Sequence, residues 1–134
     1  MILVDTSVWV DFLNSTRSRA GDELERLIRI NAPVVLTGLV LTEVLQGLKR
    51  DVEPVGQMLS RWPMIAPGGF ATYVAAATIY RQARNRGLTL STVDAVLAAV
   101  ALESSAEFFT LDQDFGRLDF VGLKLHRCQD NQEV

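Results

Sequence analysis

The sequence predicts an α/β fold in which helices cover both faces of a parallel sheet. Short, uninterrupted apolar runs such as residues 1–4 and 33–36 are typical of strands that are buried on both faces. They alternate with segments whose apolar side chains recur at helical spacing, which is the pattern of βαβ units with right-handed crossovers. The 134 residues contain no repeat, low-complexity tract or internal linker, so a single domain spanning residues 1–134 is expected.

The predicted elements follow one another with short connections. In chain order they are strand 1–4, helix 7–13, helix 21–30, strand 33–36, helix 39–48, helix 55–61, strand 64–66, helix 70–86, helix 91–103, strand 107–110 and strand 123–125. The second helix begins with acidic residues and ends with Arg29 ahead of Pro33, which suits the helix dipole and a sharp stop. Gly87 is expected to cap the longest helix, and the last helix is expected to start at Ser91.

The composition is that of a globular chain that buries part of its surface against a partner. Hydrophobic residues make up 49% of the sequence, and the mean hydropathy of +0.18 is slightly apolar. Surplus apolar surface is usually buried in a complex, so a homodimer is expected. The single cysteine, Cys128, excludes an internal disulfide and a multi-cysteine zinc cluster. There is neither a signal peptide nor a membrane-spanning stretch, so a cytoplasmic location without membrane association is expected.

Arginine dominates the basic residues of a chain whose net charge is −3. There are 11 arginines and only 2 lysines, and many of the arginines cluster at positions 17–29 and 81–86. Arginine is the better bidentate ligand of phosphate. The clusters therefore predict either contacts with a nucleic-acid backbone or solvated helix faces, and the pattern alone leaves both open.

Acidic residues follow two of the predicted strands. Asp5 ends the first apolar run and is followed at once by Thr6 and Ser7, whereas Asp112 follows the fourth strand. The carboxyl edge of a parallel sheet is where open α/β folds build their sites. The alternatives are local, because Asp5 can cap the next helix and both Asp112 and Asp114 can form Asx-turns.

Two further acids lie among apolar residues of predicted helices. Asp94 has Leu97 at helical spacing, and Glu43 stands next to Val44. An ionised carboxylate in such surroundings needs a partner, because removing a charge from water is expensive. The alternatives are a capping box between Ser91 and Asp94 and a half-exposed helix position for Glu43.

Four carboxylates gathered at one edge cannot all stay ionised unless a cation lies among them. Oxygen ligands select Mg²⁺ or Mn²⁺ over zinc, and such a metal can generate and orient a hydroxide at a phosphodiester. Competing chemistries lack their residues. There is no Gly-rich phosphate loop, and the only histidine, His126, is expected at the surface. An aspartyl-phosphate phosphatase needs a second aspartate where Ser7 stands, and Lys124 is a poor match for the lysine of a phospho-receiver domain.

Four motifs jointly resemble those of PIN-domain ribonucleases of the VapC toxin type. They are Val-Asp5-Thr-Ser-Val-Trp, Leu-Thr-Glu43-Val-Leu-Gln-Gly, Ser-Thr-Val-Asp94-Ala-Val-Leu-Ala-Ala and Phe-Thr-Leu-Asp112-Gln-Asp-Phe, in matching order and spacing. The resemblance implies a three-layer α/β/α PIN-like fold whose central parallel sheet has the strand order 3-2-1-4-5. It also implies an Mg²⁺- or Mn²⁺-dependent endoribonuclease that acts as the toxin of a VapBC-type toxin–antitoxin pair.

The resemblance assigns site roles by position. The residues that match the family's acidic quartet are Asp5, Glu43, Asp94 and Asp112. The three aspartates would hold the metal, and Glu43 would bind it through water or act as the base. Asp114 would be an auxiliary ligand or bind through water. Ser7, or else Thr6, matches the hydroxyl that supports the first aspartate.

The implied reaction is hydrolysis by metal-activated water, which leaves 5′-phosphate and 3′-hydroxyl ends. Contacts with the RNA backbone are predicted for Arg17, Arg19, Arg81, Arg84 and Arg86. The implied partners are the RNA substrate, a second copy of the chain and a VapB-type antitoxin, in a heterotetramer or larger complex. Helices 39–48 and 55–59 are expected to wall the groove that receives the antitoxin.

The sequence leaves two other functions open. The first is a non-catalytic PIN-like module that binds RNA or protein, which metal-dependent cleavage lost in Asp5→Asn would exclude. The second is a haloacid-dehalogenase-like phosphatase, which Ser7 already argues against and which turnover of a generic phosphomonoester would revive.

Overall fold

A three-stranded parallel sheet lies at the centre of the computed structural model, which describes residues 1–129. Its strands are β1 (Ile2–Val4), β2 (Val34–Val35) and β3 (Glu107–Phe109), in the order β2-β1-β3. Leu3 aligns with Val35 on one side and with Phe108 on the other. All of β1 is buried, as expected for a central strand whose run of apolar residues has no polar alternation.

The two edge strands predicted from the sequence are reduced to single bridges. Met64 bridges to Leu36 beyond β2, and Leu125 bridges to Phe108 beyond β3, both in parallel. Their positions are those that the order 3-2-1-4-5 requires, but the predicted lengths are wrong. Pro63 and Pro67 bracket the first of these segments, and proline lacks the N–H that a longer ladder needs.

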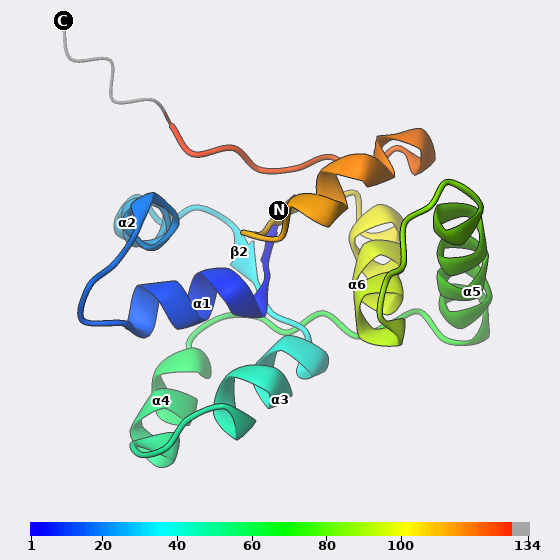
Figure 1. Ribbon diagram of the computed structural model, residues 1–134. Coiled ribbons are helices and arrows are strands. Elements are labelled where there is room, and N and C mark those ends of the chain that lie inside the picture. The colour runs from blue at the N-terminus through cyan, green and yellow to red at the C-terminus, as the bar shows by residue number, and fades with distance from the viewer. Residues whose placement is uncertain (130–134) are drawn as a thin grey trace, which may run out of the picture.

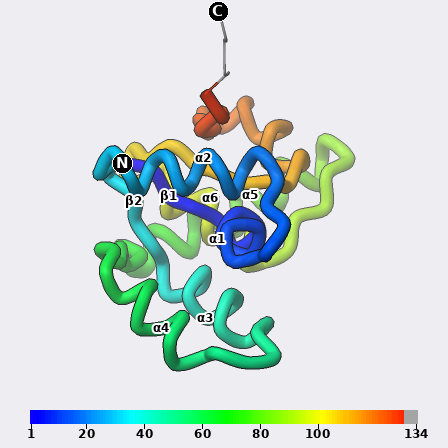
Figure 2. Tube along the Cα trace, turned by 90° about the vertical axis from the view of Figure 1, so that its left-hand side faces the viewer, coloured from blue at the N-terminus to red at the C-terminus, as the bar shows by residue number. Residues whose placement is uncertain are grey.

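Helices cover both faces of this sheet. In chain order they are α1 (Thr6–Leu13), α2 (Arg19–Arg29), α3 (Gly38–Gln46), α4 (Val52–Leu59), α5 (Phe70–Asn85), α6 (Thr92–Glu103) and the 3₁₀ segment η1 (Gln113–Val121). Figure 1 shows α1 and α2 on one side of β1 and α5 and α6 on the other. The side view in Figure 2 agrees, with α1 and α2 in front of the sheet and α5 and α6 behind it. The predicted three-layer architecture is confirmed.

Helix α6 is the buried member of its layer. Every residue from 95 to 101 is buried, because α6 contacts the sheet on one face and α5 on the other. A helix that is apolar all round is expected to be enclosed in this way. Within the part of the chain that the structure describes, no helix has the combined length and apolar character required to cross a membrane.

Most helix boundaries follow the predicted signals. Gly87 has φ of 80°, and its N–H donates to the carbonyl of Arg84 at 3.0 Å, so it ends α5 as expected. Helix α4 starts at Val52 rather than after Pro54, because a proline fits the first turn of a helix. Segment η1 was not predicted, since a 3₁₀ helix has a period near three and lacks the α-helical pattern.

The segment that follows the bridge at Leu125 contacts α2 through the side chain of His126. Its side chain is 12% exposed, with Nε2 2.7 Å from Glu23 and Nδ1 3.0 Å from Glu107. The predicted surface position of His126 is therefore wrong. Burial raises the pKa of Glu23, but hydrogen bonds from Arg26 and His126 outweigh it and lower that pKa to about 2. This carboxylate is accordingly ionised and structural.

Candidate carboxylate site

Asp5 lies where β1 ends and α1 begins, as the sequence predicts. Its backbone N–H donates to the carbonyl of Phe109 at 2.8 Å, so the ladder to β3 fixes its position. The residue is 8% exposed. It occupies the N-cap position of α1, but its side chain makes no capping hydrogen bond. The capping role considered from the sequence is therefore wrong for the side chain, which is held by other partners.

Two hydroxyl groups hold the Asp5 carboxylate. Ser7 Oγ donates to Asp5 Oδ2 at 3.1 Å, and Thr110 Oγ1 donates to the same oxygen at 2.8 Å. The backbone N–H of Leu111 donates to Ser7 Oγ at 3.0 Å, and that of Asp112 donates to Thr110 Oγ1 at 3.0 Å. The chain that leaves β3 is thereby fastened to the first aspartate through both hydroxyls.

Burial raises the pKa of Asp5 above its ordinary value of 3.8. The hydrogen bonds from Thr110 and Ser7 act against this by stabilising the ionised form, and the negative charge of Asp94 raises the pKa further. Asp94, in the first turn of α6, is therefore near enough to Asp5, the residue that follows β1, for its charge to act on it. An acid that is both buried and repelled by a second acid favours a cation beside it.

Asp94 serves as a capping residue and still presents a free oxygen. The Asp94 N–H donates to Ser91 Oγ at 3.0 Å, and the Ser91 N–H donates to Asp94 Oδ2 at 3.3 Å, which confirms the predicted capping box. Among residues 1–129, Asp94 Oδ1 has no hydrogen-bond partner. The capping box therefore fixes the orientation of this carboxylate and leaves Oδ1 able to accept another hydrogen bond or to bind a cation.

The Glu43 carboxylate accepts a hydrogen bond from the first helix and is not fully solvated. It is half-buried on α3, and its Oε1 accepts a hydrogen bond from Thr6 Oγ1 at 2.9 Å. The start of α3 is itself fixed, because Thr37 Oγ1 accepts from the N–H of Val40 at 3.1 Å. The two hydroxyls after Asp5 thus divide their roles: Ser7 supports Asp5, and Thr6 supports Glu43.

Asp112 and Asp114 are more exposed than the other acids. Asp112 Oδ1 accepts from the N–H of Asp114 at 2.9 Å, so the Asx-turn considered from the sequence is present and caps η1. Within residues 1–129, no group of three or more Asp, Glu, His or Cys side chains is placed closely enough to hold a metal ion. The pair that the fold couples is Asp5 and Asp94, and the wider ligand set stays a prediction.

Thr110 is the site residue that sequence reasoning missed. A polar residue directly after an apolar strand was the available signal. Val4 aligns with Phe109 in the sheet, so the next residues, Asp5 and Thr110, come to lie side by side. Knowing that β1 and β3 are neighbours would have been sufficient to pair them.

The predicted RNA-contacting arginines form two separate groups. Arg17 is engaged locally: its Nε donates to the carbonyl of Phe12 at 2.8 Å and its Nη1 lies 3.1 Å from Glu25. It and Arg19 lie by the start of α2, whereas the other three lie on or just after α5, at the opposite side of the molecule (Figure 1). Arg81 and Arg84 are exposed and lack partners among the described residues.

Comparison with known proteins decides the family. The model of the PIN domain matches residues 2–121. The chain belongs to the PIN-domain family. Ribonuclease VapC11 of Mycobacterium tuberculosis is 32% identical over 119 residues, which cover 86% of this chain and 89% of that protein. The recognition of a VapC-type PIN domain from its motifs is thereby confirmed.

Solved structures agree on the PIN fold. VapBC2 from Rickettsia felis, bound to a DNA fragment from its promoter, has a TM-score of 0.73 at 22% identity and covers 94% of this chain and 98% of its own. A toxin–antitoxin complex from Klebsiella pneumoniae has a TM-score of 0.70 at 21% identity, with 86% and 90% covered. At these identities the similarity establishes the fold.

Proposed function

We propose that this PIN-domain chain is a metal-dependent endoribonuclease that acts as the toxin of a VapBC-type toxin–antitoxin pair. The observation that carries the proposal is the buried Asp5 carboxylate, whose pKa is raised by burial and by the charge of Asp94. Such an arrangement disfavours two ionised acids unless a cation balances them. The identity to a named VapC ribonuclease supplies the reaction class.

The donor set fits a hard divalent cation. Every candidate ligand is a carboxylate oxygen, and Mg²⁺ characteristically binds one or two carboxylates together with waters and substrate phosphate oxygens. Asp5 and Asp94 would hold Mg²⁺ or Mn²⁺, with Asp112 as the third ligand and Asp114 as an auxiliary one. When bound, the metal supplies an activated water and offsets charge on the phosphodiester.

The protein's own groups prepare this reaction. Ser7 and Thr110 orient Asp5 by donating to one of its oxygens. Glu43, which a hydrogen bond from Thr6 positions, would either accept a proton from the attacking water or help to hold the cation through a water molecule. The phosphodiester is cut so that the products carry a 5′-phosphate and a 3′-hydroxyl.

The partners follow from the same proposal. A VapB-type antitoxin inserts an amphipathic segment between α3 and α4, where Leu41, Leu45 and Met58 are only partly buried. Phe70, 88% exposed, and Val74, 50% exposed, are apolar surface for a homodimer, which the antitoxin assembles into a heterotetramer or larger complex. The site of action is the cytoplasm, where both RNA and newly made antitoxin are found.

The test is cleavage of RNA by the purified chain without antitoxin. Structured cellular RNAs incubated with Mn²⁺ are expected to be cut at discrete positions, and EDTA is expected to abolish the cutting. The 5′ ends of the fragments should be phosphorylated. RNA that is bound but never cut, with or without Mn²⁺, would instead establish the non-catalytic module.

Thr110→Val is expected to lower the cleavage rate about tenfold, as removal of a group that orients a metal ligand typically does. The Thr110 hydroxyl stabilises ionised Asp5, so its loss raises the Asp5 pKa further. The acidic limb of the pH–rate profile should therefore move to higher pH. Thr42→Val is the matched control, because Thr42 is exposed and donates only to its own helix, to the carbonyl of Gly38. An acidic limb at the same pH in Thr110→Val as in wild type would contradict this role.

A further inference from the structure

Residues 123–129 connect the edge of the sheet with α2. Figure 1 shows this stretch running from η1 back towards α2. Backbone hydrogen bonds hold its first part against β3, since the Phe108 N–H donates to the Lys124 carbonyl at 2.8 Å and the His126 N–H donates to the Phe108 carbonyl at 2.8 Å. We call residues 123–129 the strap.

His126 is the side chain through which the strap reaches α2. Its Nε2 lies 2.7 Å from Glu23 Oε2 on α2, and its Nδ1 lies 3.0 Å from Glu107 Oε1 at the start of β3. The ring also lies against Phe109, with 4.9 Å between the ring centres. Each nitrogen of this imidazole therefore faces a carboxylate oxygen, and the two carboxylates belong to different elements.

Two carboxylate neighbours select the charged form of the imidazole. An ionised carboxylate only accepts hydrogen bonds, whereas a neutral imidazole has one N–H and one nitrogen with a bare lone pair. In the neutral form, that lone pair would face the oxygen of Glu23 or of Glu107 at hydrogen-bonding distance. Imidazolium donates to both carboxylates at once, and both hydrogen bonds are then charge-assisted.

The two carboxylates differ in how firmly they are held. Glu23 is 5% exposed, and Arg26 donates to both of its oxygens, at 2.7 and 2.9 Å. It is ionised at every pH near neutrality, because its pKa is about 2. The side chain of Glu107 is 51% exposed, and among residues 1–129 its carboxylate has no hydrogen-bond partner besides His126. Glu107 can therefore turn to water, whereas Glu23 cannot.

The strap itself carries the other charged or titratable groups near the ring. Lys124 and Arg127 precede and follow it and are exposed, and Cys128 is half-buried with its Sγ 4.0 Å from the carbonyl of Arg19. Within the described part of the chain, the acids that contact the imidazole are thus the one on α2 and the one on β3. No candidate metal ligand is among these groups.

Loss of the proton from His126 removes one of these two attachments. The single remaining N–H stays with buried Glu23, and the contact with exposed Glu107 is given up to water. The stabilisation that the charged ring provides is complete below about pH 6.5, where histidine ordinarily titrates, and is lost as the pH rises through the titration of the folded chain.

We propose that residues 123–129 act as a pH-sensitive strap, which the imidazolium of His126 fastens to α2 and β3 and which loosens as the pH rises past neutral. Half-buried Cys128, two residues further on, is the group that loosening makes accessible. The inference is independent of the proposed ribonuclease chemistry, because it uses none of the residues assigned to that site.

Proton NMR of the intact chain measures the charge of His126 directly, because it is the only histidine and gives a single Cε1–H resonance. Glu107→Gln removes one carboxylate and should lower the midpoint of that titration by about 0.5 on the pH scale. Arg26→Gln removes the cation that competes for Glu23 and should raise the midpoint by a similar amount. A side chain that is merely packed would not show shifts of opposite sign.

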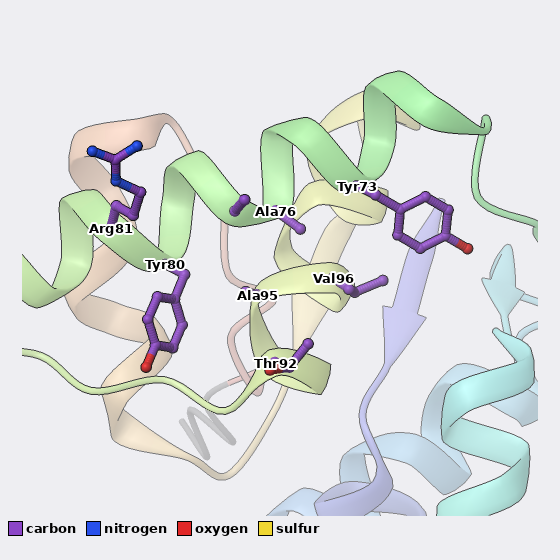
Figure 3. Close-up of a pocket in the computed structure, with 8 residues that line it drawn as sticks. Tyr73, Ala76, Tyr80, Arg81, Thr92, Ala95 and Val96 are labelled. Atoms are coloured by element: carbon purple, nitrogen blue, oxygen red, sulfur yellow. The ribbon is translucent and has the colours of Figure 1, made fainter.

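Two exposed residues away from the strap supply controls of matched charge. Glu53→Gln, in the first turn of α4, changes the net charge as Glu107→Gln does. Arg81→Gln changes it as Arg26→Gln does, and Arg81 lies on α5 at the depression between α5 and α6, on the other side of the sheet from α2 (Figure 3). Neither control should move the midpoint.

Reaction of Cys128 with a maleimide measures the loosening itself, because the chain has no other cysteine. His126→Asn cannot become charged, so the ratio of its rate to the wild-type rate at each pH removes the effect of pH on the thiol. Wild type is expected to react about fivefold more slowly than His126→Asn at about pH 6 and at the same rate at about pH 9. Glu107→Gln keeps the imidazole and should converge with wild type in the same way, so the result does not depend on whether His126→Asn folds.

Three results would overturn the inference. The first is an unchanged midpoint in both Glu107→Gln and Arg26→Gln. The second is a shift of equal size in the two charge controls, which would make the effect one of bulk charge. The third is a ratio of Cys128 reaction rates that stays constant across the pH range, which would show that the strap is held equally well without the proton.

Discussion

Replacing Asp5 with asparagine is expected to lower the rate of RNA cleavage by at least about 100-fold, since loss of even a supporting partner of a metal ligand costs 10- to 100-fold. The amide keeps the shape of the side chain and can still accept from Ser7 and Thr110. What the side chain loses is its negative charge, which interacts with the charge of Asp94. Cleavage of a defined RNA with saturating Mn²⁺ is the measurement, and cleavage at the wild-type rate would contradict the assignment.

The same substitution is expected to stabilise the metal-free fold. The pKa of Asp5 is higher in the folded chain than its ordinary value of 3.8, so the folded state holds the proton more tightly than the unfolded state. The free energy of unfolding therefore falls as pH rises through the window above 3.8, and at neutral pH ionised Asp5 is a cost. Asparagine removes that cost, with an expected gain on the order of 1 kcal/mol at pH 7.

Thermal denaturation in EDTA at several pH values checks this second half of the prediction. The gain in Asp5→Asn should shrink as the pH approaches 3.8 from above and vanish where the wild-type aspartate is protonated in both states. Asp51→Asn is the matched control, because Asp51 is exposed and has φ of 63°, a conformation that asparagine also tolerates. A variant less stable than wild type at every pH would show that the carboxylate supports the fold instead.

Truncating Trp9 to alanine is expected to lower the free energy of unfolding by about 3–5 kcal/mol, the range for deletion of a large buried ring. Trp9 is 0% exposed and is the largest side chain in the core. The centre of its ring lies 5.0 Å from the centre of the Trp62 ring and 5.9 Å from the centre of the Phe12 ring. Since Trp9 fixes α1 directly after Asp5, the Ala variant should also lose catalytic activity through local disorder.

Trp9→Phe is expected to be far milder, at about 1–2 kcal/mol, because it removes part of the ring without removing any hydrogen bond. Within residues 1–129, the buried Trp9 Nε1 has no hydrogen-bond partner, so the indole N–H is itself a liability of the wild-type core. Urea denaturation of the two variants measures the difference. Equal losses in both would mean that the indole N–H contributes to stability.

The parts of the fold that the sequence could predict are those governed by local pattern. The apolar run of β1, the capping box of Ser91 and Asp94 and the terminating Gly87 each depend on residues within a few positions of one another. The same holds for Asp5 at the end of β1, since a buried strand followed by an acid fixes the position of that acid.

The missed features depend on contacts between distant segments. Thr110 reaches Asp5 only because β3 pairs with β1, and His126 is partly buried where it contacts Glu23 of α2 and the ring of Phe109. The edge segments at Met64 and Leu125 look like strands by composition, but each finds a single bridge in the sheet. The sequence pattern within a segment does not determine how many residues of the neighbouring strand it can pair with.

We propose that Asp5 and Asp94 form the core of a divalent-metal site. Calorimetric titration of antitoxin-free protein with Mn²⁺ tests it most directly, with wild type, Asp5→Asn and the Asp51→Asn control side by side. We expect wild type and Asp51→Asn to bind Mn²⁺ with equal affinity and Asp5→Asn to bind it at least about tenfold more weakly. Equal Mn²⁺ affinity in wild type and Asp5→Asn would contradict it.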